Sequence, residues 1–108
     1  MKTIKINNVE YELEQHDNGK MLKDIKIPEG WRLLLPSEAM MLYERGLIDS
    51  SSWFFVKQIN KNLAKKGYVA RFVASSVWAS LYCNEDPSDA SDSLGVILCR
   101  DLKKVMKK

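Results

Sequence analysis

The chain has 108 residues, of which 45% are hydrophobic and 29% charged, with five glycines and three prolines. This length suits one compact domain over residues 1–108, and the composition is typical of a soluble globular protein rather than a disordered chain. No apolar run reaches the roughly 18–20 residues that a membrane span needs, and the start lacks the apolar core of a secretory signal. We therefore expect a soluble, cytoplasmic protein with no membrane span and no signal peptide.

The net charge of +3 is unevenly divided along the chain. Residues 71–102 hold 2 basic and 5 acidic side chains, a net charge of −3, whereas residues 103–108 add four lysines. A nucleic-acid-binding surface concentrates positive charge where it works. Because the most distinctive segment is acidic, we do not expect nucleic acid as a partner.

Short strands and turns are predicted at the start. Residues 3–6 and 9–13 alternate polar with apolar side chains, and Asn7-Asn8 between them tolerates left-handed backbone angles, which predicts a hairpin. The segment 14–20 contains Asp17-Asn18-Gly19 and is predicted to be a loop.

Two helices are predicted in the middle of the chain. Pro36-Ser37 opens the first, with Ser37 as its N-cap, and Gly46 ends it. The second is predicted over residues 50–66, with Gly67 as its stop. Helical spacing would give this second helix an inward apolar stripe and an outward basic one, namely Phe55, Val56, Ile59 and Leu63 against Lys57, Lys61 and Lys65.

The pattern changes to strands from Tyr68 onward. Residues 68–73, 77–82 and 94–100 are predicted to form an antiparallel sheet, interrupted by a polar loop over 83–93. We therefore predict an α+β fold in which two helices pack on one small antiparallel sheet. The tryptophans are expected to support it, Trp31 and Trp53 as core anchors and Trp78 beneath the polar loop.

Catalytic patterns are weak. His16 is the only histidine and is expected to be a plain surface residue, and no phosphate-binding or zinc-protease motif is present. Cys83 and Cys99 are too few for a disulfide framework or a zinc site, so free thiols are expected. The sequence thus predicts no enzyme, no cofactor and no metal site.

The segment from Arg71 to Leu102 indicates binding instead. It contains no Lys, Gln, Met or His, although the other residues include 13 lysines. In their place is a run of Ser, Asp, Asn and Tyr between Ser75 and Ser93, residues that offer adaptable hydrogen bonds and flat aromatic area on a loop. Tyr82, at the end of a predicted strand, is a candidate for ligand contact.

Short motifs in the chain resemble a known family. These are Pro28-Glu29-Gly30-Trp31-Arg32-Leu33, Pro36-Ser37-Glu38-Ala39, Val77-Trp78-Ala79-Ser80 and Gly95-Val96-Ile97-Leu98-Cys99-Arg100. Together they resemble the C-type lectin fold in its formylglycine-generating-enzyme-like form, most of all the variable proteins of diversity-generating retroelements of archaeal or archaeal-virus type. The resemblance implies a C-type lectin-like fold and a variable region over about residues 75–98, in which a reverse transcriptase alters codons at adenines.

The resemblance also implies an alphabet of residues. Asparagine codons altered at adenine yield Ser, Asp, Tyr, Cys, Ile and several others, but not Lys, Gln, Glu, Met or Trp. Residues 75–98 fit apart from Trp78, then a fixed scaffold residue, and Glu85. The implied partner is a protein or glycan on a cell or virus surface, and the resemblance adds a virion-associated location as an alternative to the cytoplasm. The implied ligand-facing sites are Ser75, Ser76, Val77, Ser80, Tyr82, Asn84, Asp86, Ser88, Asp89, Ser91, Asp92, Ser93 and Ile97.

Three different functions are also compatible with the sequence. One is a Ca²⁺-dependent carbohydrate-binding lectin that uses Asn84, Glu85, Asp86 and Asp89 as ligands. Another is an oxidase like the formylglycine-generating enzymes, with Cys83 and Cys99 as a redox pair. The third is a small nucleic-acid-binding regulator that uses the lysine-rich second helix.

Overall fold

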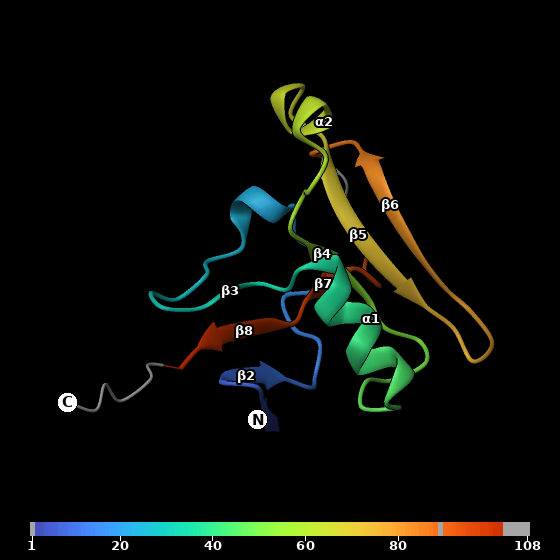
Figure 1. The fold of residues 1–108 in the computed structure, drawn as a ribbon. Helices are drawn as coiled ribbons and strands as arrows, with labels where there is room; N and C mark the ends of the chain where they lie inside the picture. Colours follow the sequence, from blue (N-terminus) through green and yellow to red (C-terminus); the bar gives the residue numbers. More distant parts are fainter. Residues whose placement is uncertain (1, 89, 103–108) are drawn as a thin grey trace.

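The computed structural model describes residues 2–88 and 90–102 and shows a small α+β fold (Figure 1). Eight short strands and two short α-helices alternate along the chain with one 3₁₀ turn. In order they are β1 (Thr3–Ile6), β2 (Val9–Glu12), the turn η1 (Leu22–Asp24), β3 (Arg32–Leu33), α1 (Pro36–Glu44), β4 (Trp53–Val56), α2 (Lys61–Lys65), β5 (Val69–Ala74), β6 (Ala79–Glu85), β7 (Gly95–Val96) and β8 (Leu98–Asp101).

The strands form two sheets, not the single sheet predicted. The first has the order β1-β2-β8-β3 and is antiparallel, and the second has the order β6-β5-β4-β7, in which β7 runs parallel to β4. The predicted strand over 94–100 is interrupted at Ile97, where the chain passes from the second sheet to the first. The α+β class is therefore confirmed. The predicted antiparallel pairing of the strands near 68–73 and 77–82 is confirmed as β5 and β6, whereas the predicted strand 94–100 does not pair with them.

The N-terminal hairpin is confirmed. Asn7 and Asn8 have φ values of 50° and 66°, the left-handed angles that a two-residue hairpin turn requires. On its other side β2 pairs with β8, with Tyr11 opposite Cys99. The hairpin therefore completes its sheet with a strand from the opposite end of the sequence.

Helix α1 begins two residues earlier than the predicted cap at Ser37 implies, and it ends where expected. Pro36 occupies the first helical position, and Leu35, not Ser37, is the N-cap. The backbone N–H of Leu35 donates to the Glu38 carboxylate at 2.8 Å, and Arg32 donates to the same carboxylate at 2.8 and 2.9 Å. Burial disfavours the charged form of Glu38, but these hydrogen bonds outweigh it and hold the pKa of Glu38 below its usual range. Gly46, at φ 67°, ends the helix.

The second predicted helix is wrong over most of its length. Trp53–Val56 form the strand β4, and α2 is confined to Lys61–Lys65, where the Asn60 side chain caps it by accepting from the Leu63 N–H at 3.0 Å. Phe55 and Val56 therefore face opposite sides of a sheet, and Ile59 is exposed instead of lying on an inward stripe. The predicted stop at Gly67, φ 85°, is confirmed.

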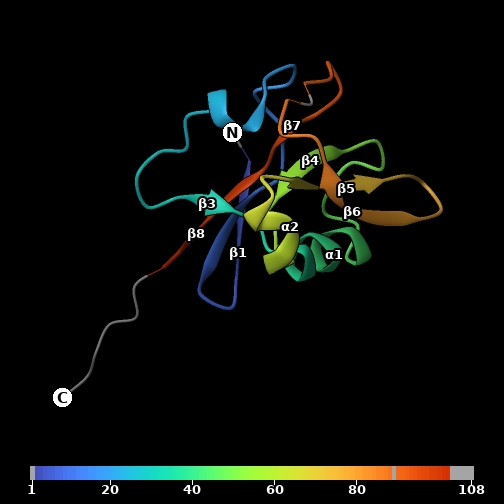
Figure 2. The same ribbon diagram turned by 90° about the horizontal axis from the view of Figure 1, so that it is seen from above.

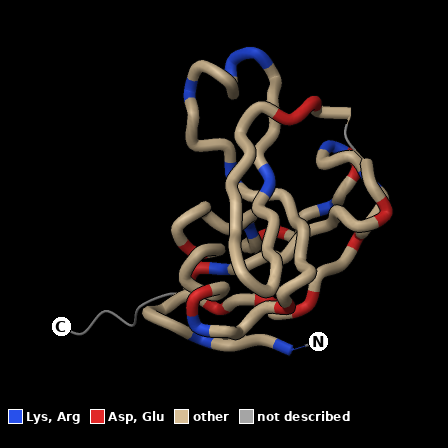
Figure 3. Tube along the Cα trace, turned by 90° about the vertical axis from the view of Figure 1, so that its right-hand side faces the viewer, with Lys and Arg blue, Asp and Glu red and all other residues tan. Residues whose placement is uncertain are grey.

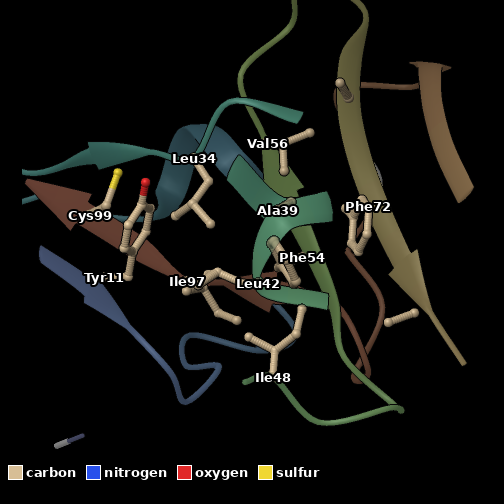
Figure 4. Close-up of a cluster of buried hydrophobic side chains, with 12 residues drawn as sticks. Tyr11, Leu34, Ala39, Leu42, Ile48, Phe54, Val56, Phe72, Ile97 and Cys99 are labelled. Carbon is tan, nitrogen blue, oxygen red and sulfur yellow. The ribbon is translucent and has the colours of Figure 1, made fainter. Parts of the chain in front are cut away.

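Two apolar clusters lie on opposite sides of the second sheet. The larger one packs α1 on the sheet, with Leu42 beside Phe54, and includes Phe72 and Ile97 (Figure 4). The smaller one contains Phe55, Leu94 and Val96, with the half-buried Trp31 and Trp53 at its margin. Figure 2 shows α1 on one side of this sheet, with the loop at 14–20 and the segment leading into β7 on the other.

Candidate functional site

Most of the predicted ligand-facing residues are exposed. Three others are half-buried, namely Ser75, Ser80 and Ser91, and Asp89 lies outside the described residues. The prediction for Ile97 is wrong, because its side chain is 0% exposed within the larger apolar cluster (Figure 4). We use the name candidate surface for the exposed members, Ser76, Val77, Tyr82, Asn84, Asp86, Ser88, Asp92 and Ser93.

The tip of the β5–β6 hairpin is fixed by Ser75. Its hydroxyl accepts from the N–H groups of Val77 and Trp78 at 3.3 and 3.1 Å, and its carbonyl accepts from the Tyr43 hydroxyl at 2.9 Å. Ser75 is therefore better described as part of the turn than as a ligand contact. The turn projects Val77, 83% exposed, and Trp78, 47% exposed, so the prediction that Trp78 packs beneath a loop is wrong.

Strand β6 is an edge strand of the second sheet, and its Tyr82 belongs to a row of stacked side chains that also includes Arg71 of β5 and Trp53 of β4. The guanidinium of Arg71 lies 5.4 Å from the ring centroid of Tyr82 and 5.5 Å from that of Trp53. Arg71 also pairs with Glu85 at 3.2 Å. Cation–π contacts of this kind hold the row in place, while Tyr82 stays 39% exposed.

Beyond β6, serine and aspartate side chains build turns. The Asp86 carboxylate accepts from the N–H and the hydroxyl of Ser88 at 2.8 and 2.6 Å, and these hydrogen bonds lower the pKa of Asp86. The Ser91 hydroxyl accepts from the Ser93 N–H at 3.2 Å, and the Ser91 carbonyl accepts from the Gly19 N–H at 3.0 Å. Much of the polar segment is thus occupied in shaping its own backbone.

A pocket of about 490 Å³ opens beside the candidate surface. Three segments that are distant in sequence line it, at residues 13–18, 49–52 and 92–93. We call it the acidic pocket, because its walls carry three carboxylates and three hydroxyls, those of Glu14, Asp49 and Asp92 and of Ser51, Ser52 and Ser93.

Gln15 joins these three segments. Its amide oxygen accepts from the Trp53 N–H at 2.8 Å, and its amide nitrogen donates to the Asn18 side chain at 2.9 Å and to the Ser93 carbonyl at 2.8 Å. One side chain thereby fixes the spacing between the walls. Gln15 and the 49–52 wall were not predicted from the sequence, because the serines at 50–52 have the pattern of a helix start.

His16 is not a plain surface residue. Its ring nitrogens lie 2.7 Å from carboxylate oxygens of Asp17 and Glu12, and its backbone exchanges two hydrogen bonds with Val96, of 3.0 and 2.9 Å. Burial alone would lower the pKa of His16, but the hydrogen bonds with Asp17 and Glu12 outweigh it and raise that pKa. The Glu12 carboxylate also accepts from the Leu98 N–H at 2.8 Å, so His16 belongs to a partly buried structural network.

The two cysteines are free, as expected, and lie in different sheets. Burial, and then the nearby Glu38 carboxylate, raises the pKa of Cys99 to about 12. At neutral pH this thiol is protonated, and its side chain is fully buried. The geometry therefore gives no support to a redox role for Cys83 and Cys99, since reactive cysteines are accessible thiolates.

A calcium-dependent lectin and a nucleic-acid-binding regulator fit the geometry no better than a redox enzyme does. Of the residues that could bind calcium, Glu85 is paired with Arg71 and Asp86 is engaged with Ser88, and no group of three His, Cys, Asp or Glu side chains among residues 2–88 and 90–102 is arranged to hold a metal ion. The long basic helix that a nucleic-acid-binding regulator would need is replaced by β4 and a five-residue α2, whose lysines lie at one end of the molecule (Figure 3).

Comparison with protein-family models, with curated proteins and with solved structures gives no match. In the described part of the chain, no helix combines the length and apolar character needed to traverse a lipid bilayer.

Proposed function

We propose that this protein is a binding module that recognises a protein or glycan partner non-covalently through the candidate surface. The observation that carries the proposal is the exposure of eight predicted residues on elements whose positions are fixed by other residues. Ser75 fixes the hairpin tip, Arg71 fixes the row at Tyr82, and Gln15 fixes the segment at Ser93. Side chains can therefore change on this surface while the backbone is held.

The dimensions of the candidate surface favour a large partner. The hairpin tip and the turn at Asp86 are at opposite ends of the seven-residue β6. At about 3.3 Å per residue, the ends of such a strand are roughly 20 Å apart. A small molecule does not span that distance, whereas a typical protein interface of about 800 Å² per partner does.

We further propose that the module is a variable protein of a diversity-generating retroelement with a C-type lectin-like fold. Support comes from the composition of residues 75–98, which matches the asparagine-codon alphabet at all positions but Trp78 and Glu85. Glu85 is paired with Arg71 and so has a role that a constant residue would fill, whereas Trp78 is an exposed ring at the hairpin tip. Ile97, being buried, is excluded from the variable set.

A library tests the binding function. The eight positions of the candidate surface would be randomised together, displayed, and selected against immobilised proteins and glycans. A control library would randomise eight exposed positions on α1, α2 and the β1–β2 hairpin. We expect folded, specific binders from the first library at a clearly higher frequency. Equal yields from the two libraries, or general loss of folding in the first, would refute the proposal.

The genomic surroundings test the lineage separately. We expect a reverse-transcriptase gene near the coding sequence, together with a second copy of the codons for residues 75–98. The two copies should differ only opposite adenines of the template copy. Differences scattered over all four bases would contradict the retroelement lineage without touching the binding function.

A further inference from the structure

We propose that the acidic pocket receives the cationic end of a lysine or arginine side chain of the bound partner. This inference rests on the proposed function, since it assigns a chemistry to one part of the partner. The pocket lies at the edge of the candidate surface, with Asp92 and Ser93 common to both. A partner docked on the candidate surface therefore has this pocket beside it.

The charge of the lining selects a cation. Glu14, Asp49 and Asp92 come from three separate segments, and none of the nine lining residues is Lys, Arg or His. The nearby Lys20 ammonium is held by Asp17 at 2.8 Å, and the Arg71 guanidinium is held between Trp53 and Tyr82. These two cations are thus engaged elsewhere. No basic residue of the pocket lining neutralises the three carboxylates.

Ser52 is the second observation that points to a ligand. It lines the pocket and is only 5% exposed, yet its hydroxyl makes no hydrogen bond with any residue in 2–88 or 90–102. Its backbone, by contrast, is fully used, with the N–H donating to Asp49 and the carbonyl accepting from Ala74. The Ser52 hydroxyl oxygen is not sealed off from the pocket, so it is open there to a group that enters, and it has no protein partner to give up. An N–H donor from a ligand in the pocket would satisfy it.

The arrangement suits an organic cation better than a metal ion. Among the described residues, the pocket's carboxylates do not form a group of three that could coordinate one ion. Ammonium and guanidinium groups instead carry three or five N–H donors, which reach several separated acceptors at once. A pocket of about 490 Å³ also lies in the range typical of ligand sites, and its walls are held in advance by Gln15.

The direct test uses model side chains. The ¹⁵N-labelled protein would be titrated at low salt with Nα-acetyl-lysine N-methylamide, its arginine counterpart, and the norleucine compound, which has a similar chain without the charge. We expect saturable amide shifts at Gly19, Ser52 and Ser93 with the two cations and none with norleucine. The variant Glu14→Gln/Asp49→Asn should weaken binding by about tenfold or more, since its charges form the site. The matched control Glu44→Gln, an exposed carboxylate on α1, should leave it unchanged.

Absence of saturation by both cations, or equal binding by the Glu14→Gln/Asp49→Asn variant, would overturn the inference. That variant leaves the candidate surface intact, so the display library can be rebuilt on it. If binders are recovered on both backgrounds with the same frequency and the same lysine and arginine content of their targets, the pocket inference fails and the proposed function stands. If neither background gives binders, the proposed function itself fails.

Discussion

Replacement of Gly95 by alanine should disrupt the wall of the acidic pocket. Gly95 is the first residue of β7, and its Cα faces the loop at 14–20 at close range. A Cβ at this position would lie well inside 3.0 Å of both the Asn18 side-chain oxygen and the His16 carbonyl oxygen. The Asn18 side chain can rotate away, but the His16 carbonyl is backbone and moves only with the loop.

The cost has two parts. Overpacking of a closed site costs about 1–3 kcal/mol. Displacement of the loop also breaks the two backbone hydrogen bonds between His16 and Val96, each of which contributes about 0.5–1.5 kcal/mol. The sum for Gly95→Ala is about 2–6 kcal/mol, which for a domain near this size lowers the melting temperature by roughly 10–30 °C.

Urea unfolding and thermal melting would measure the loss, and amide shifts of residues 15–19 would report the movement of the loop. Gly30→Ala is the matched control. Gly30 has φ 88°, but a Cβ added there would have no heavy atom within 4 Å, so only backbone strain of about 1–2 kcal/mol is expected. The reasoning would be refuted if Gly95→Ala lowered the free energy of unfolding no more than Gly30→Ala does, or if it left the amide chemical shifts of residues 15–19 unchanged.

Three further results are expected. Glu12→Ala should destabilise the fold by about 3 kcal/mol in urea, because it removes the acceptor of the buried Leu98 N–H and of His16, and a change below about 1 kcal/mol would contradict this. The pKa of His16 is raised in the folded state, so its stabilising contribution is complete below the unfolded pKa of about 6.5 and is lost as pH rises through the folded value. The difference in unfolding free energy between the protein and His16→Asn should therefore be larger at low pH than at high pH. A pH-independent difference would refute this assignment. Val77→Asn and Asn84→Tyr should each change stability by no more than about 0.5 kcal/mol, whereas Leu42→Ala should cost about 2–5 kcal/mol, and similar costs for all three would show that the candidate surface is not independent of the core.

Local signals in the sequence were sufficient where the structure is local. The turn at Asn7-Asn8 and the helix stop at Gly46 depend on backbone angles that few residues tolerate, and both predictions are confirmed. The exposure of residues such as Asn84 and Asp92 was also predicted, because short polar side chains are rarely buried.

The failures have a common physical origin in tertiary packing. Trp53–Val56 is covered on both faces, so its apolar run has no alternation and resembles a helix segment in sequence. Ile97 was placed on the surface by the family resemblance, and a single residue between two short strands has no periodicity that would have corrected this. The acidic pocket was not predictable at all, because its walls come from three segments that only the folded chain brings together.

The position of β8 has a consequence for biosynthesis. This strand is the last of the described strands, yet it lies inside the first sheet, between β2 and β3. The first sheet therefore cannot close on the ribosome until the codons for residues 75–98 have been translated. A product that stops or changes reading frame within them lacks β8 and leaves the N-terminal hairpin without its neighbour. Successful folding thus requires that the segment be read through in frame, with its buried residues from Leu94 to Leu98 in place.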